Sequence, residues 1–153
     1  MTIGGSRVAS LVDTNILVYR CDASDPVKQE AARKILREGT AKNELRIPHQ
    51  ALIEFLNAVT RGRSGGRSLL PREEAWRQAE DLLNEFPVLY PNESIFRTAI
   101  LGMAGYRLPC YDAHLWAYAE HYGVPEILSE DFEHGRRYGT VRVRNPFAEL
   151  GLT

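Results

Sequence analysis

Four acidic residues, spread over most of the chain, stand where a carboxylate could take part in chemistry. Asp13 directly follows an apolar run, and Asp131 comes shortly after another. Glu54 lies in an almost wholly apolar stretch, and Asp112 opens the segment "DAHLWAYAEHYG". Carboxylates that share one cleft repel one another, and a hard cation such as Mg²⁺ or Mn²⁺ neutralises them through oxygen ligands. The residue types therefore indicate a metal-dependent acidic site, if the fold brings the four together.

Each of these acids also has a purely structural interpretation. Asp13 and Asp112 could cap a helix, because an aspartate at a helix N-terminus accepts hydrogen bonds from unpaired backbone N–H groups. Asp131 could be an ordinary turn residue. Glu54 could pair with Asn57 or Arg61 on a solvated polar helix stripe, which consists of Gln50, Glu54, Asn57 and Arg61. Taken one at a time, none of the four acids identifies a site.

The elements that must position these acids alternate between strands and helices. Strands are predicted at residues 7–12, 44–48, 87–90, 126–131 and 140–144, and helices at 14–20, 26–38, 49–61, 71–86, 92–104 and 112–122. Gly39 is expected to follow the second helix as its C′ residue. The alternation predicts parallel strands joined by helical crossovers that cover the sheet. Ligands bind beyond the carboxyl ends of such strands, and Asp13 and Asp131 both stand there.

Four segments of the chain resemble the acidic motifs of the PIN-domain family. In order, they are "LVDTNILVY", "PHQALIEFLNAVTR", "YDAHLWAYAEHYG" and "ILSEDF". The likeness is greatest to the VapC ribonuclease toxins of bacterial toxin–antitoxin pairs, and it extends from about Val8 to Pro146. The resemblance implies an α/β fold of the PIN-like three-layer kind, with a central parallel five-stranded sheet flanked by helices. It also implies a Mg²⁺- or Mn²⁺-dependent endoribonuclease that acts on RNA, pairs with a small cognate antitoxin and forms a homodimer.

The same resemblance assigns the site residues. By matching motifs, the acidic positions fall to Asp13, Glu54, Asp112 and Asp131, and the supporting polar positions to Asn15 and Ser129. We expect Asp13 and Asp112 to be the strongest metal ligands, because Mg²⁺ keeps several waters and often takes only one or two carboxylates directly. Glu54 and Asp131 would bind through water, hold a second metal or orient the attacking water.

A loop with three arginines is a further candidate for contact with RNA. Arg61, Arg63 and Arg67 flank a Ser-Gly-Gly sequence in "RGRSGGR" and could bind RNA phosphates, although a solvated connection has the same composition. Two other functions stay open at this point: a non-catalytic PIN-like RNA-binding module and a phospho-acceptor signalling domain. The second is disfavoured, because receiver domains need a Lys near the last strand and all three Lys lie before residue 43.

Length and composition fit one globular domain. The 153 residues, 44% hydrophobic and 25% charged, predict a single domain over residues 1–153, in which residues 1–7 form a flexible N-terminal tail. The sequence has no apolar run of membrane-helix length, and its N-terminus lacks the apolar stretch of a secretory signal. Cys21 and Cys110 form no motif, and the four His lack metal-ligand spacing. We therefore expect a reduced, cytoplasmic protein without membrane association.

Overall fold

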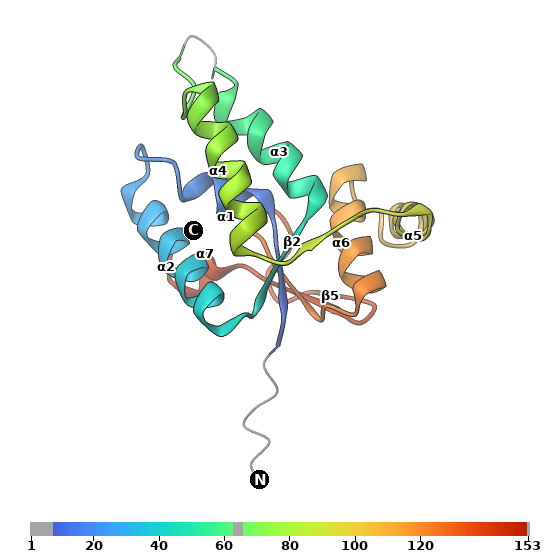
Figure 1. The fold of residues 1–153 in the computed structure, drawn as a ribbon. Helices are drawn as coiled ribbons and strands as arrows, with labels where there is room; N and C mark the ends of the chain where they lie inside the picture. Colours follow the sequence, from blue (N-terminus) through green and yellow to red (C-terminus); the bar gives the residue numbers. More distant parts are fainter. Residues whose placement is uncertain (1–7, 63–65, 153) are drawn as a thin grey trace.

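A computed structural model describes residues 8–62 and 66–152, which form six strands in one sheet (Figure 1). The strands are β1 (Ser10–Val12), β2 (Leu45–Pro48), β3 (Val88–Leu89), β4 (Glu126–Leu128), β5 (Arg137–Tyr138) and β6 (Val141–Arg144). Their order across the sheet is β3-β2-β1-β4-β6-β5. All neighbours are parallel except β5, which pairs with β6 in antiparallel fashion. The predicted α/β class is confirmed. The predicted number of five strands is wrong, because the sheet has a sixth strand, β5, at its edge.

The extra strand depends on a turn that the sequence pattern did not reveal. β5 and β6 are joined by Gly139 and Thr140 alone, and Gly139 has a φ of 62°. Glycine adopts this left-handed conformation at no steric cost, which permits a tight hairpin. Because β5 has only two residues, alternation of apolar and polar side chains cannot be recognised in it.

Seven helices of the described chain cover the two faces of the sheet. They are α1 (Thr14–Tyr19), α2 (Pro26–Lys42), α3 (His49–Thr60), α4 (Arg72–Glu85), α5 (Glu93–Tyr106), α6 (Cys110–Tyr122) and α7 (Pro146–Glu149). Figure 1 shows α5 and α6 on one side of the sheet and α2 and α7 on the other. The architecture therefore has three layers, with the sheet in the middle.

The core consists of two clusters, one on each face of the sheet. Leu11 and Ile127 are fully buried against residues of α5 and α6, such as Trp116. The next strand residues, Val12 and Leu128, belong to the cluster that contains side chains of α1, α2, α3, α4 and α7. Successive strand residues point to opposite faces, so both faces of β1 and β4 are buried. This explains why these strands appear in the sequence as continuous apolar runs.

Two helix ends differ from the sequence-based expectation. α2 continues through Gly39 to Lys42 and ends at Asn43, which has a φ of 54°. Gly39 is instead a site of close packing, because a Cβ atom there would overlap the Leu45 side chain. α6 begins at Cys110, two residues before the predicted start, because Pro109 provides the extended backbone that precedes it.

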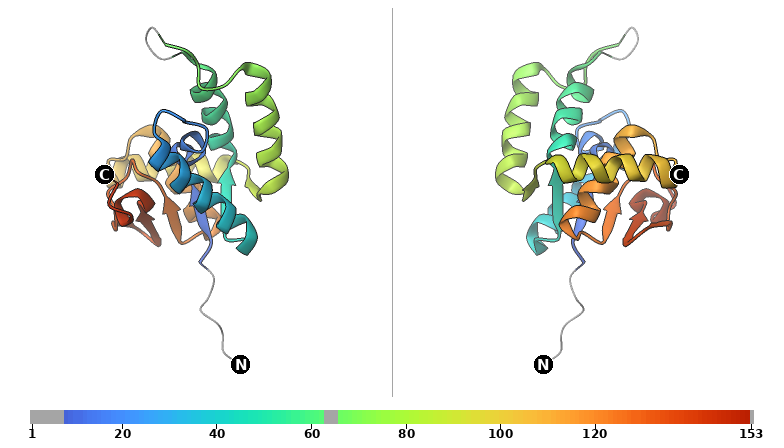
Figure 2. Two further views of the ribbon diagram at one scale, coloured as in Figure 1. Left: turned by 90° about the vertical axis from the view of Figure 1, so that its left-hand side faces the viewer. Right: turned by 90° about the vertical axis from the view of Figure 1, so that its right-hand side faces the viewer.

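The α3–α4 pair is the most prominent extension of the molecule. Figure 2 shows the two helices side by side, reaching beyond the sheet towards the segment that joins them. Of the three arginines in that segment, Arg63 lies outside the described residues. The predicted tail of residues 1–7 lies outside them as well. Among the helices of residues 8–62 and 66–152, none is long and apolar enough to cross a membrane.

Candidate active site

The carboxyl ends of β1 and β4 lie side by side, because these two strands are adjacent and parallel. Val12 pairs with Leu128 at the end of each strand, and the Asp13 N–H donates to the Leu128 carbonyl over 3.0 Å. Ser129 follows β4 at this same edge. The sheet thus brings together Asp13 and Ser129, which are 116 residues apart in the sequence.

Asp13 is buried at this edge, with 7% of its surface exposed. Its Oδ1 accepts a hydrogen bond from the Thr14 N–H at 2.6 Å, as the N-cap of α1. Its Oδ2 accepts one from the Ser129 hydroxyl at 2.6 Å. Burial raises the pKa of Asp13 from 3.8 to about 7, against the lowering effect of the Ser129 hydrogen bond, and the charges of Asp131 and Glu54 raise this pKa too. Asp13 therefore caps a helix and also belongs to a group of interacting acids.

Asn15 and Ser129 lie between Asp13 and Asp131. The Asn15 Nδ2 is 3.4 Å from Asp13 Oδ2, 3.3 Å from Ser129 Oγ and 3.2 Å from Asp131 Oδ2. The Asp131 N–H donates to Ser129 Oγ over 3.0 Å, which fixes the backbone of Asp131. These contacts hold the exposed Asp131 carboxylate close to the buried one of Asp13. The two residues predicted to support the site thus touch two of its acids.

Glu54 reaches the same region from α3. Its Oε2 accepts a hydrogen bond from the Thr14 hydroxyl at 2.7 Å, and its Oε1 accepts one from Gln50 Nε2 at 2.8 Å. Thr14 is the residue next to Asp13, so its hydroxyl ties α3 to the beginning of α1. The alternative pairing of Glu54 with Asn57 or Arg61 is not what the structure shows, since Thr14 and Gln50 occupy both of its oxygens.

Asp112 approaches from α6. It lies in the first turn of this helix, but Pro109 is the N-cap residue, so the capping interpretation of Asp112 is wrong. Burial raises the pKa of Asp112, and the charges of Asp131 and Glu54 raise it further. Asp112 therefore lies close enough to both carboxylates to interact with them electrostatically.

All four acids line one cavity of about 850 Å³. Three residues of the Glu54 stripe, Gln50, Asn57 and Arg61, line it too. The walls also include residues that were not predicted from the sequence to take part in the site: Thr14, His49, Tyr111, His114 and Tyr118. Thr14 and Tyr111 each adjoin a predicted acid, which is the one local signal that could have identified them. Of the predicted arginines, Arg61 reaches the cavity, whereas the exposed Arg67 is not part of its wall.

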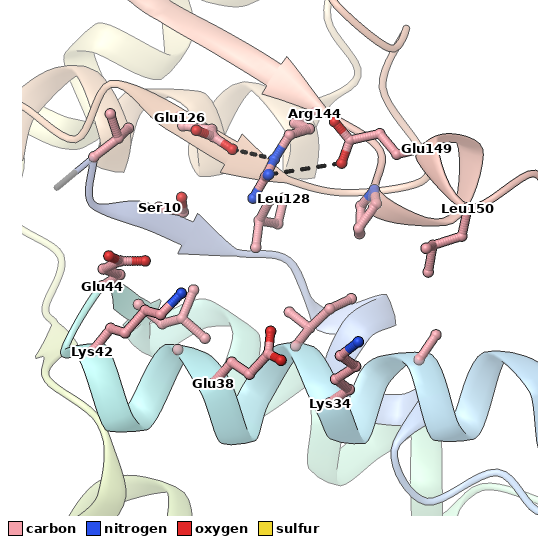
Figure 3. Close-up of a pocket in the computed structure, with 16 residues that line it drawn as sticks. Ser10, Lys34, Glu38, Lys42, Glu44, Glu126, Leu128, Arg144, Glu149 and Leu150 are labelled. Atoms are coloured by element: carbon pink, nitrogen blue, oxygen red, sulfur yellow. Dashed lines mark ion pairs between the residues drawn. The ribbon is translucent and has the colours of Figure 1, made fainter. Parts of the chain in front are cut away.

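The charges of this cavity are not balanced by neighbouring bases. Among the described residues, none of the four carboxylates forms an ion pair with Lys, Arg or His. A second cavity, of about 560 Å³ between α2 and the sheet, is different (Figure 3). There the Arg144 Nε lies 2.5 Å from Glu126 Oε1, and its Nη1 lies 3.7 Å from Glu149 Oε1. Uncompensated negative charge thus distinguishes the first cavity from the second.

The donor set of the acidic cavity suits a hard divalent cation. Its acids and Asn15 offer oxygen atoms, which Mg²⁺ and Mn²⁺ prefer. The Asn15 Oδ1 is buried and has no hydrogen-bond partner within the described parts of the chain, so one acceptor is left over. In those same parts, no three acidic, His or Cys side chains are grouped closely enough to hold a metal ion together. A cation would therefore be held by one or two carboxylates with water completing its coordination, as Mg²⁺ commonly is.

The PIN domain family model matches residues 10–139 of this chain. The chain therefore belongs to the PIN domain family, and the resemblance found in its four acidic segments is confirmed. No curated protein sequence matches it significantly.

Solved structures with this fold include proteins of toxin–antitoxin systems. The chain is similar to the toxin–antitoxin complex from Klebsiella pneumoniae, with 16% identity and a TM-score of 0.64 over 90% of this chain and 98% of that one. It is similar to VapC20 of Mycobacterium tuberculosis, a sarcin–ricin loop cleaving toxin, with 16% identity and a TM-score of 0.64 over 80% of this chain and 90% of that one. It is also similar to the DNA-bound VapBC from Salmonella typhimurium, with 14% identity and a TM-score of 0.66 over 91% of this chain and 98% of that one. At these identities the likeness establishes a common fold.

Proposed function

We propose that this PIN-domain protein is a metal-dependent endoribonuclease and the toxin of a toxin–antitoxin pair. One observation carries the proposal: Asp13, Glu54, Asp112 and Asp131 line a single cavity without an ion-pair partner among the described residues. Similar folds in toxin–antitoxin complexes, and in a toxin that cleaves the sarcin–ricin loop, support it.

The residues of the cavity take distinct roles in this proposal. Asp13 and Asp112 bind Mg²⁺ or Mn²⁺ directly, and Glu54 and Asp131 bind directly or through water. When bound, the cation makes a water molecule more acidic and offsets the charge that develops on the phosphate. The Asp13 carboxyl, with a pKa of about 7, becomes fully charged only above neutral pH unless a cation stabilises the charged form.

Hydrogen bonds keep these carboxylates in place. Thr14 and Gln50 both donate to Glu54, so its carboxylate cannot rotate freely. Ser129 and Asn15 do the same for Asp13, and Asn15 extends the network to Asp131. Such preorganisation lets charged groups stabilise a transition state without first having to reorganise.

RNA cleavage by the purified protein tests the proposal. We expect endonucleolytic products with Mg²⁺ or Mn²⁺ and none after treatment with EDTA, and sequencing of the new ends would identify the cut. RNA binding without cleavage in either condition would favour the non-catalytic RNA-binding module. Retention of labelled phosphate on the chain after an acid quench would instead indicate a phospho-acceptor domain.

The proposed partners follow from charge and exposed surface. An acidic cavity attracts cationic side chains, so an antitoxin could place an Arg or Lys across it and compete with the metal. For the homodimer, α5 offers an exposed apolar face with Phe96, Ile100 and Leu101, which are 56%, 48% and 68% exposed. Co-purification with a small protein encoded in the same operon tests the proposed antitoxin. Sedimentation of the pure chain tests the proposed homodimer. Such a toxin would act in the cytoplasm, where its RNA is found.

A further inference from the structure

Aromatic side chains stand around the acidic cavity together with the carboxylates. Tyr111, His49 and His114 all belong to its wall. The Tyr111 side chain is 71% exposed, so its ring adds little to the core of this chain. A large exposed ring beside a proposed nuclease site is a surface on which a base could stack.

The backbone of Tyr111 is fixed between two of the acids. The Gln50 Nε2 donates to the Tyr111 carbonyl over 3.1 Å and to Glu54 Oε1 over 2.8 Å. The next residue in the chain is Asp112, which lines the same cavity. A single amide thus connects α3 to the first turn of α6. The backbone from which the Tyr111 ring projects therefore has a defined position next to both acids.

A pair of rings, His49 and Tyr90, also lies at this edge of the sheet. His49 follows β2 directly, and its ring centroid lies 5.4 Å from that of Tyr90, with an angle of 34° between the planes. The Tyr122 hydroxyl donates to the Tyr90 carbonyl over 2.7 Å, which holds Tyr90 in place. Tyr90 is 52% exposed, so this pair also offers ring surface to a ligand.

The charge of the cavity makes such rings useful to a nuclease. RNA phosphates are negative, and the four acids repel them unless cations intervene. Of the Lys and Arg residues in the described chain, Arg61 alone reaches the wall of this cavity. Stacking between a base and a ring requires no charge and tolerates any base. It therefore supplies an attraction that the carboxylates cannot cancel.

We propose that Tyr111 and the His49–Tyr90 pair stack unpaired bases next to the phosphate that is cut. This inference rests on the proposed ribonuclease function and assigns the side chains that bind the unpaired bases of its RNA substrate. Bases in a duplex are already stacked on one another and do not offer their faces to a protein side chain. Tyr111 is then a binding residue that selects for unpaired RNA.

Fluorescence anisotropy with two RNA probes tests the inference. The probes are a labelled single-stranded 12-mer and a duplex of the same length, and Mg²⁺ is present. All variants carry Asp13→Asn, so that the probe stays intact. Adding Tyr111→Ala should raise the Kd for the single strand by about tenfold and leave the Kd for the duplex unchanged. Tyr111→Phe keeps the ring and should bind both probes as the parent does.

Trp76→Ala is the matched control, because Trp76 is a 55% exposed ring on α4 that is not part of the cavity wall. It should leave both Kd values unchanged. Equal single-strand affinity of the Tyr111→Ala and Tyr111→Phe proteins would overturn the inference. So would a change of sedimentation coefficient in Tyr111→Ala, because Tyr111 would then serve self-association.

The outcome can be separated from that of the proposed function. If the wild-type protein cuts no RNA in Mg²⁺ or Mn²⁺, the proposed function fails, whatever the binding data show. If it cuts RNA, the same probes are digested by wild type and by Tyr111→Ala. The inference then requires that Tyr111→Ala loses much of the preference for the single strand, and an unchanged preference would refute it.

Discussion

Replacing Asp13 by Asn removes a buried charge and keeps the shape of the side chain. The pKa of Asp13 is about 7 in the folded protein and 3.8 in its ordinary state, so the folded protein binds more protons between these pH values. The stability of the metal-free protein therefore falls as the pH rises through this window. Since each pH unit corresponds to about 1.4 kcal/mol, the loss above pH 7 is roughly 4 kcal/mol at most. Asp13→Asn avoids this loss.

The substitution also weakens contacts of the carboxylate. Asn keeps an oxygen for the Thr14 N–H, but its amide nitrogen cannot accept the hydrogen bonds that Ser129 and Asn15 donate to Asp13 Oδ2. Each loss costs about 1 kcal/mol. The net gain in free energy of unfolding at pH 8 is then roughly 2 kcal/mol. For a protein of this size, that raises the melting temperature by about 4–8 °C.

Urea unfolding followed by circular dichroism measures this effect in metal-free protein. Asp13→Asn should be more stable than wild type at pH 8 and no more stable at pH 4, where the folded Asp13 carboxyl is already neutral. Asp25→Asn is the control, because Asp25 caps α2 through the Lys28 N–H at 3.1 Å and Asn caps a helix equally well. Its stability should match that of wild type at both pH values.

Metal and activity complete the test. Mg²⁺ or Mn²⁺ should stabilise wild type by binding to the folded form, and Asp13→Asn and Asp112→Asn should lose most of this stabilisation. Both should also lose RNA cleavage by about 10²-fold or more, as when a group that stabilises transition-state charge is removed. If Asp13→Asn is less stable than wild type at pH 8 without metal, and cleaves normally per folded molecule, Asp13 is only a helix cap and the reasoning is refuted.

Two further predictions concern packing and RNA phosphates. Gly39→Ala should destabilise the protein by about 1–3 kcal/mol, because its Cβ would overlap Leu45, whereas Gly105→Ala, in open space on α5, should stabilise it by about 0.5–1 kcal/mol; equal melting temperatures would contradict this. Arg61→Gln should flatten the slope of log Kd for RNA against log salt by about one. An equal effect of Arg67→Gln would show that the loop, and not the cavity, binds the phosphates.

Local rules in the sequence account for where the acids stand. Asp13 and Asp131 follow buried strands, and the carboxyl ends of parallel strands share one edge of the sheet. Glu54 could be placed because a helix repeats every 3.6 residues, which puts Gln50, Asn57 and Arg61 on its face. All four residues of this stripe do line the cavity. These signals act over a few residues, so the chain order alone carries them.

Local rules failed where a contact with a distant segment decided the outcome. Gly39 is of the residue type that commonly ends a helix, but it lies inside α2, where the absence of a side chain leaves room for Leu45. The edge strand β5 is too short to show a pattern and exists because it pairs with β6. Asp112 has the sequence context of a cap, yet the helix begins before it at Cys110.

The amino-acid sequence by itself determined the α/β class and the parallel core of the sheet, because periodicity and strand ends are properties of neighbouring residues. The four acids were singled out by the resemblance of their segments to PIN-domain motifs. Tertiary structure decided how these acids behave. The Thr14 hydroxyl meets Glu54 across 40 residues, and Ser129 meets Asp13 across 116. The pKa of Asp13 reaches about 7 because packing removes water from it and brings Asp131 and Glu54 near. Burial and charge proximity depend on segments that only the folded chain brings together, so no local pattern could have predicted them.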